Sequence, residues 1–200
     1  MPYDAIFAPA PSTTRGQSTV IAVDEKGGNL LYGSGRSVVI RSIADPLKAE
    51  LFTEHAKDVT VAKCSPSGMY VASGDAGGVI KIWALDNPEH PVKYEGQCLA
   101  GPICDIAWSP DSQRVCAVGD GRDCMGRVFM WDSGSTVGEI GGHSKKILSC
   151  DFKQSRPFQI LTAAEDFQVP LPGPCPQTVS TPTHSTPMNS CPWCLKTNRR

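Results

Sequence analysis

The sequence shows no excess of charge of either sign, no apolar run of membrane-spanning character and no export signal. Lysine and arginine total 19 against 20 aspartates and glutamates, so the net charge of -1 argues against a basic nucleic-acid surface and a polybasic membrane patch. The long uncharged run at 167–195 is broken by prolines and polar residues, which excludes a spanning helix there. The N-terminal residues lack the basic and apolar parts of a secretory signal, so we expect neither export nor membrane insertion.

Motifs of catalysis and nucleotide binding are also missing. The chain contains no Gly-x-Gly-x-x-Gly, Walker, Gly-x-Ser-x-Gly or His-Glu-x-x-His motif. The glycine-rich segment 74–78 is typical of a turn between strands, and no helix follows it whose amide groups would hold a phosphate. We therefore predict that the protein is not an enzyme and that it uses no cofactor.

The nine cysteines are an odd number, and four of them lie within apolar strand patterns: Cys64, Cys104, Cys116 and Cys150. In such positions a reduced thiol behaves as a small buried hydrophobe, which favours the reducing cytoplasm as the location. Cys191 and Cys194 have the two-residue spacing of a zinc or redox pair. No second pair of ligands lies nearby at regular spacing, so an unstructured segment is the preferred interpretation and no metal site is predicted.

What the sequence does contain is a repeat. The segments 78–83 and 126–132 both run from a glycine through apolar residues to a tryptophan, and Trp83 and Trp131 lie 48 residues apart. A period of about 40 to 50 residues with short strands is typical of β-propeller blades. The 19 glycines and 17 prolines, many of them at turns, fit many short strands better than long helices.

Two units of this repeat share three β-rich segments joined by turns. The segments are 59–64, 69–74 and 79–83 in one unit, and 103–108, 114–119 and 128–131 in the next. The first turn is Ser-Pro-Ser-Gly in one unit and Ser-Pro-Asp-Ser in the other, and its proline presets φ for a tight reversal. A weaker unit precedes them, with Arg41 in the place of the tryptophan.

A further unit begins at Gly142-His143 and continues to the acidic pair Glu165-Asp166. Where a last strand is due, the prolines of segment 169–174 prevent ladder hydrogen bonds. Residues 167–200 contain seven prolines and no charge before Lys196, so little there repays the entropy of folding.

We therefore predict an all-β fold over residues 1–166, an incomplete β-propeller of about three blades plus an N-terminal strand. Residues 167–200 are predicted to form a divergent, disordered, proline-rich tail. The units are expected at about 17–45, 54–86, 98–133 and 142–166.

The Gly-His opening, the Ser-Pro turns and the strands that close in Trp or Trp-Asp resemble WD repeats. Several runs resemble, more specifically, the actin-interacting protein 1 family: 53–56, 61–63, 72–75, 119–123, 128–135 and 153–158. The resemblance covers roughly residues 1 to 166. It implies part of a protein with two joined seven-bladed propellers that is not an enzyme and works with cofilin to disassemble actin filaments. The departure after Asp166 implies a truncated form of reduced activity.

The resemblance also implies an actin-facing surface, whose acidic residues fall by motif position on Asp123 and Glu165. Acidic side chains on loops orient a basic partner, and the alternative is that both are ordinary solvated turn residues. Trp83, Trp108 and Trp131 are interpreted as packing residues of the blades, in preference to a ligand-stacking role.

His143 and Asp166 match the structural His and Asp of a WD blade, which are joined by buried hydrogen bonds, in preference to a catalytic dyad. In the blade that contains His55, Gly77 stands where this Asp would be. The polar network of that blade is therefore expected to be incomplete.

Three blades leave two sheet faces without a neighbour, because a propeller protects its edges only when its last blade meets its first. We therefore expect marginal stability and self-association through the open blade edges. The expected partners are actin filaments and cofilin. The alternative function is a generic protein-interaction scaffold or regulatory fragment without actin activity.

Overall fold

The computed structural model describes residues 7–15, 17–24, 28–45, 47–122, 124–167 and 169. Within these ranges the chain forms three four-stranded antiparallel sheets and one two-stranded sheet, and it contains no helix. The described part therefore also has no helical segment with the length and apolar character of a membrane span. The prediction of an all-β, incomplete propeller is confirmed. The predicted tail lies outside the described residues, apart from Phe167 and Val169.

The sheets follow one another along the chain, each with its strands in sequence order. The first sheet contains β1 (Ile21–Val23), β2 (Asn29–Ser34), β3 (Ser37–Ser42) and β4 (Ala49–Phe52). The second contains β5 (Val59–Cys64), β6 (Tyr70–Asp75), β7 (Val79–Ala84) and β8 (Val92–Gln97). The third contains β9 (Ile103–Trp108), β10 (Arg114–Gly119), β11 (Gly126–Met130) and β12 (Thr136–Ile140). The fourth contains β13 (Ile147–Phe152) and β14 (Ile160–Ala164).

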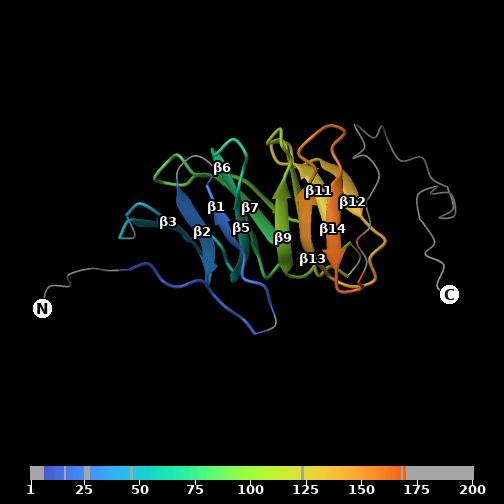
Figure 1. Cartoon of the computed structure of the whole chain (residues 1–200), viewed down its shortest axis with the longest axis horizontal. Helices are drawn as coiled ribbons and strands as arrows, with labels where there is room; N and C mark the ends of the chain where they lie inside the picture. The colour runs from blue at the N-terminus through green and yellow to red at the C-terminus, as the bar shows by residue number, and fades with distance from the viewer. Residues whose placement is uncertain are drawn as a thin grey trace, which may run out of the picture.

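Figure 1 shows the four sheets in a row along the longest axis of the molecule, with the first sheet in blue and the fourth in orange at the other end. The first strands of successive sheets pack together, β1 against β5, β5 against β9 and β9 against β13. The fourth strands β4, β8 and β12 form the opposite edges of their sheets. This is the strand arrangement of propeller blades, and the row does not close into a ring.

Apolar side chains fill the interface between each sheet and the next, which we call the first, second and third seams. The largest contributors are Phe52 and Trp83 at the first seam, Trp108 and Phe129 at the second, and Phe152 and Ile147 at the third. All six are buried. Because apolar surface is removed from water mainly by the neighbouring sheet, each sheet depends on the next for its stability.

One carboxylate joins three of the sheets. Asp105 lies in β9 and is 5% exposed. Its Oδ1 lies 2.6 Å from Lys63 Nζ in β5, and its Oδ2 accepts hydrogen bonds from the Ser149 hydroxyl and the Cys150 amide in β13, both at 3.0 Å. Charge-assisted hydrogen bonds of this kind are stronger than neutral ones. Asp105 therefore links the inner strands of the second, third and fourth sheets.

The two predicted Ser-Pro turns close in the same way. The amides of Gly68 and Ser112 donate to the carbonyls of Ser65 and Ser109, each at 2.8 Å. Both closing residues have a left-handed backbone, with φ of +70° at Gly68 and +57° at Ser112. Glycine adopts this conformation without strain, which explains its place in the first of the two turns.

The hairpin that follows these turns differs by two residues between the second and third sheets. Trp83 pairs with Val71, and the corresponding pair in the third sheet is Phe129 with Val115. Trp131 comes directly after the end of β11. The equivalence of Trp83 with Trp131, which the 48-residue period predicts, is therefore corrected by the register, because the loop between β10 and β11 is longer.

The outer strands lie outside the units predicted from the sequence. β4, β8 and β12 fall between the ranges 17–45, 54–86, 98–133 and 142–166. These strands are largely exposed, and β8 contains no buried residue. The apolar alternation that identifies the inner strands is consequently weak in them.

Candidate functional site

Charged side chains from the third and fourth sheets meet at one end of the strands. Asp120 follows β10, Lys146 precedes β13 and Glu165 follows β14; we call these three residues the charged cluster. Lys146 Nζ lies 3.0 Å from Glu165 Oε1, with the two side chains 31% and 42% exposed. The hydrogen bond to Glu165 and the charge of its carboxylate raise the pKa of Lys146, and Asp120 adds to this rise. The cluster is therefore an accessible surface of mixed charge.

Cys104 in β9 lies among these charges. Burial raises the pKa of its thiol, Lys146 opposes this rise, and the carboxylates of Asp120 and Glu165 add to it. The thiol therefore remains protonated near neutral pH. Because the thiolate is the reactive form, Cys104 has no feature of a catalytic nucleophile.

Glu165, one of the two residues predicted to face actin, belongs to the charged cluster, whereas Asp123 lies outside the described residues. Glu165 is an exposed side chain whose charge is paired with Lys146. Sequence reasoning missed Lys146 and Asp120. The available signals were the position of Lys146 three residues after His143 and that of Asp120 in the same loop as Asp123.

His143 and Asp166, predicted as structural partners, lie together in the fourth sheet. His143 Nδ1 is 3.1 Å from Asp166 Oδ2, and its Nε2 is 2.9 Å from the hydroxyl of Thr162 in β14. The Ser144 amide also donates to Asp166 Oδ2 at 3.0 Å. This network joins the segment before β13 to the turn after β14, and it thereby brings Lys146 and Glu165 next to each other.

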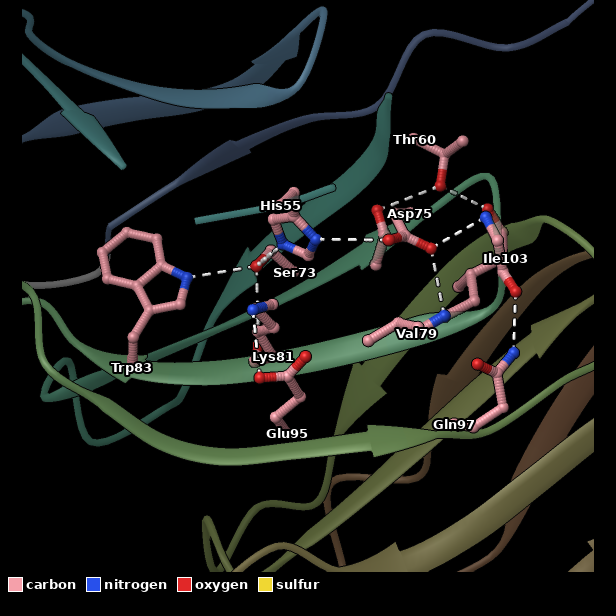
Figure 2. A network of polar contacts seen from close by, with 12 residues as sticks. His55, Thr60, Ser73, Asp75, Val79, Lys81, Trp83, Glu95, Gln97 and Ile103 are labelled. Carbon is pink, nitrogen blue, oxygen red and sulfur yellow. Dashed lines mark hydrogen bonds and ion pairs between the residues drawn. The ribbon is translucent and has the colours of Figure 1, made fainter. Parts of the chain in front are cut away.

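The second sheet contains a related network, which Figure 2 shows from close by. His55 Nε2 lies 2.7 Å from the Ser73 hydroxyl, and the Trp83 indole donates to the same hydroxyl at 3.1 Å. His55 Nδ1 is 3.6 Å from Asp75 Oδ2 and has no hydrogen-bond partner within the described structure. Burial lowers the pKa of His55, and the carboxylate of Asp75 partly opposes this effect.

The expected incompleteness of this network holds at one atom, because His55 Nδ1 has no hydrogen-bond partner among the described residues, but an acidic side chain does lie close to it. Asp75, two residues before Gly77, supplies the carboxylate. Its Oδ1 also accepts hydrogen bonds from the amides of Gly77 at 2.8 Å and Val79 at 3.0 Å, which fixes the turn between β6 and β7. The acidic side chain reaches His55 from the end of a strand, whereas in the fourth sheet it comes from the turn.

Each network places a hydroxyl, an imidazole and a carboxylate in the order of a Ser-His-Asp triad. The hydroxyl residues are Ser73, which is 0% exposed, and Thr162, which is 1% exposed. A nucleophile must reach its substrate, and neither hydroxyl is accessible. The geometry therefore supports a structural role, in which buried polar groups satisfy one another and hold loops in place.

Comparisons with known proteins agree with this architecture. The family described as WD domain, G-beta repeat matches residues 47–84 and 92–132. The chain is 55% identical over 161 residues to the Drosophila melanogaster protein named Actin-interacting protein 1, covering 80% of this chain and 26% of that protein. The chain belongs to the actin-interacting protein 1 family.

Other relatives of this family are similar over the same length. The chain is 55% identical over 163 residues to the 66 kDa stress protein of Physarum polycephalum, covering 82% of this chain and 27% of that protein. It is 51% identical over 168 residues to WD repeat-containing protein 1 of Gallus gallus, covering 83% of this chain and 28% of that protein. The chain thus spans just over a quarter of the length of the relatives it matches.

The matched WD repeats are offset from the sheets of this actin-interacting protein 1 family member. Residues 47–84 include β4 to β7, and residues 92–132 include β8 to β11. Each sequence repeat therefore begins with the outer strand of one sheet and continues with three strands of the next. This overlap connects neighbouring blades covalently as well as by packing.

The three tryptophans predicted as packing residues lie at seams between sheets. Trp83 stacks on Phe52 of the first sheet, with ring centroids 4.4 Å apart. The Trp108 indole donates to the Lys63 carbonyl of the second sheet at 3.1 Å. Trp131 packs against Tyr70 of the second sheet, with centroids 4.6 Å apart. The structure therefore brings each tryptophan against a neighbouring blade.

In the part of the chain that the structure describes, no group of three or more His, Cys, Asp or Glu side chains is arranged to hold a metal ion. Cys191 and Cys194 lie outside the described residues.

Proposed function

We propose that this chain binds actin filaments and promotes their disassembly together with cofilin, at lower activity than its longer relatives. The observation that carries the proposal is the 55% identity to the protein named Actin-interacting protein 1. We further propose that the chain acts in the cytoplasm at the actin cytoskeleton, through protein contacts and without catalysis. Lower activity is expected because the chain spans just over a quarter of those relatives.

The charged cluster supports a binding surface at the ends of the third and fourth sheets. Glu165 is exposed there, and the His143 network holds its turn in a defined position. We propose that Glu165 and Asp123 contact basic groups of the actin–cofilin filament, because complementary charge improves the orientation and the rate of encounter. Lys146 already pairs with Glu165, so a basic group of the partner has to share or replace that ion pair.

Filament co-sedimentation of the full chain, with and without cofilin, tests this proposal. We expect the chain to pellet with filaments only when cofilin is present. The double substitution Asp123→Ala and Glu165→Ala should reduce pelleting at least severalfold and leave the thermal unfolding midpoint unchanged, since Glu165 lies in a turn and position 123 falls between β10 and β11.

The matched control is Asp86→Ala with Glu89→Ala, two exposed acidic residues in the loop between β7 and β8. That loop lies at the other end of the strands, so the control should pellet like the natural chain. Equal pelleting of the control and of the Asp123/Glu165 variant would remove the site assignment. No pelleting at any cofilin ratio would remove the actin function.

A second candidate function is that of an interaction fragment that associates through its end sheets. The apolar side chains of Ile21 and Val23 in β1 are each 54% exposed, and at the other end of the row Leu148 and Leu161 are 41% and 43% exposed. Two different apolar faces at opposite ends favour head-to-tail association, which forms open chains of molecules when it does not close into a ring. Sedimentation velocity over a range of concentrations tests this: oligomers that grow with concentration support it, and a monomer throughout contradicts it.

A further inference from the structure

A small cavity at the second seam is lined by two arginines, of which only Arg127 is paired with a carboxylate among the described residues. The cavity has a volume of about 220 Å³ and is lined by the segment 97–100, Arg122, Cys124 and Arg127. These residues come from the end of β8 and the linker that follows it, from the β10–β11 loop and from β11. The described lining residues thus include two guanidinium groups and no carboxylate.

Arg127 has hydrogen-bonding capacity that the fold leaves unused. Its Nε is buried and has no hydrogen-bond partner among the described residues. One terminal nitrogen lies 3.4 Å from Glu139 Oε1, a side chain that is 59% exposed and well hydrated. Buried polar groups are nearly always satisfied, so an unpaired guanidinium N–H is a departure that a bound anion would resolve. Arg122 is exposed and forms no ion pair with any described residue.

The two thiols and the phenol near Arg127 are neutral. Burial raises the pKa of the Cys98 thiol to about 12, against the opposing effect of Arg127. Burial also raises the pKa of Tyr94, which Arg127 likewise opposes. Cys124 donates its thiol hydrogen to the Gly126 carbonyl at 2.9 Å. None of these groups supplies the negative charge that two arginines attract.

From this arrangement we infer that the cavity binds one oxyanion group, a carboxylate or a phosphate, between Arg122 and Arg127. The planar guanidinium presents parallel N–H groups that match the two oxygens of such a group. A volume of about 220 Å³ lies below the usual range for drug-sized ligands, which favours a single acidic side chain or one phosphate over a nucleotide. The inference is independent of actin binding.

The cavity opens at the same end of the strands as the turn between β6 and β7. Gln97 Nε2 donates to the Gly77 carbonyl at 2.7 Å, and the Cys98 amide donates to the Gly78 carbonyl at 2.9 Å. The loop that contains Arg122 also contains Asp120 of the charged cluster. The cavity and the charged cluster therefore lie at the same end of the strands.

Titration of the isotope-labelled full chain by nuclear magnetic resonance at constant ionic strength tests this inference with two probes. One is inorganic phosphate, and the other is an acetylated and amidated Gly-Glu-Gly peptide, whose only charge is one side-chain carboxylate. We expect saturable shifts of the Arg127 Nε–H signal and of the amides of residues 97–100 with at least one probe. Saturation by phosphate alone identifies a free anion as the ligand, and saturation by the peptide identifies an acidic side chain.

The control variants separate a site from general attraction of anions. Arg122→Gln and Arg127→Gln should each weaken binding at least tenfold, whereas Arg36→Gln, a change at an exposed arginine of the first sheet, should leave it unchanged. If Arg127→Gln does not fold, the Arg122→Gln variant is sufficient for the test, because Arg122 is exposed. Shifts that do not saturate, that equal those given by a Gly-Gln-Gly peptide, or that persist in Arg122→Gln would overturn the inference.

Discussion

Replacing Asp105 by alanine tests whether one carboxylate holds three sheets together. The substitution removes the ion pair to Lys63 at 2.6 Å and the acceptor of two hydrogen bonds from β13. It leaves the Cys150 amide, which is buried, without its partner. Since the inner strands of the second, third and fourth sheets all contact Asp105, the loss of stability should extend over the second and third seams.

The expected loss follows from these contacts. Breaking a buried ion pair by removing one partner costs about 3–5 kcal/mol, and a buried amide left unpaired accounts for about 1–3 kcal/mol of such a loss. The Lys63 side chain is 30% exposed, so its charge regains water and the lower part of the range applies. We therefore expect Asp105→Ala to lower the free energy of unfolding by about 3–4 kcal/mol.

Equilibrium unfolding in urea, followed by far-ultraviolet circular dichroism, measures this loss. Asp105→Asn keeps an acceptor oxygen and removes the charge, so it should cost about half as much. Asp86→Ala, at an exposed loop position, is the control and should change stability by less than about 0.5 kcal/mol. If Asp105→Ala is no more destabilising than the control, the carboxylate does not join the sheets.

Burial lowers the pKa of His55 below its ordinary value of 6.5, so the unfolded chain binds more protons and stability falls as pH drops below about 6.5. His55→Gln should reduce this dependence of stability on pH by up to about 1.4 kcal/mol per pH unit. If the melting temperature of the variant falls between pH 7.5 and 5.5 as much as that of the natural chain, this prediction is wrong. Gly78 has a φ of +83° and an added Cβ would overlap the Leu99 carbonyl, so Gly78→Ala should cost more than about 1 kcal/mol in urea unfolding. Gly138→Ala, where a Cβ meets open space, is its control, and equal losses would refute the argument. Leu161→Lys should reduce concentration-dependent association in sedimentation velocity, and unchanged association would exclude this face as the contact.

The inner strands could be predicted from the sequence because their burial follows their apolar pattern, as in β10, where five consecutive residues from Val115 are buried. The outer strands could not, since β8 is an exposed edge whose hydrogen bonds to β7 do not depend on side-chain type. The two-residue shift that places Phe129 in the position of Trp83 was equally hidden. Both tryptophans follow similar residues, and only the hydrogen-bond register distinguishes them.

The polar networks were predictable to different degrees. The resemblance to WD repeats indicated the contact of His143 with Asp166, because both match the structural His and Asp of such a blade. Asp75 was missed because it stands two residues before Gly77, the position at which the acidic partner of His55 was expected. The pairing of Lys146 with Glu165 joins two segments that are distant in the sequence and that the His143 network brings together. No local sequence pattern therefore predicts this ion pair.

The placement of the tryptophans gives the molecule built-in optical reporters. Trp83 stacks across the first seam, and Trp108 and Trp131 contact the second sheet across the second seam. Separation of two blades would expose the indole at that seam to water and shift its emission to longer wavelength. Single replacements by phenylalanine would therefore show, without an attached dye, which of the first two seams opens first.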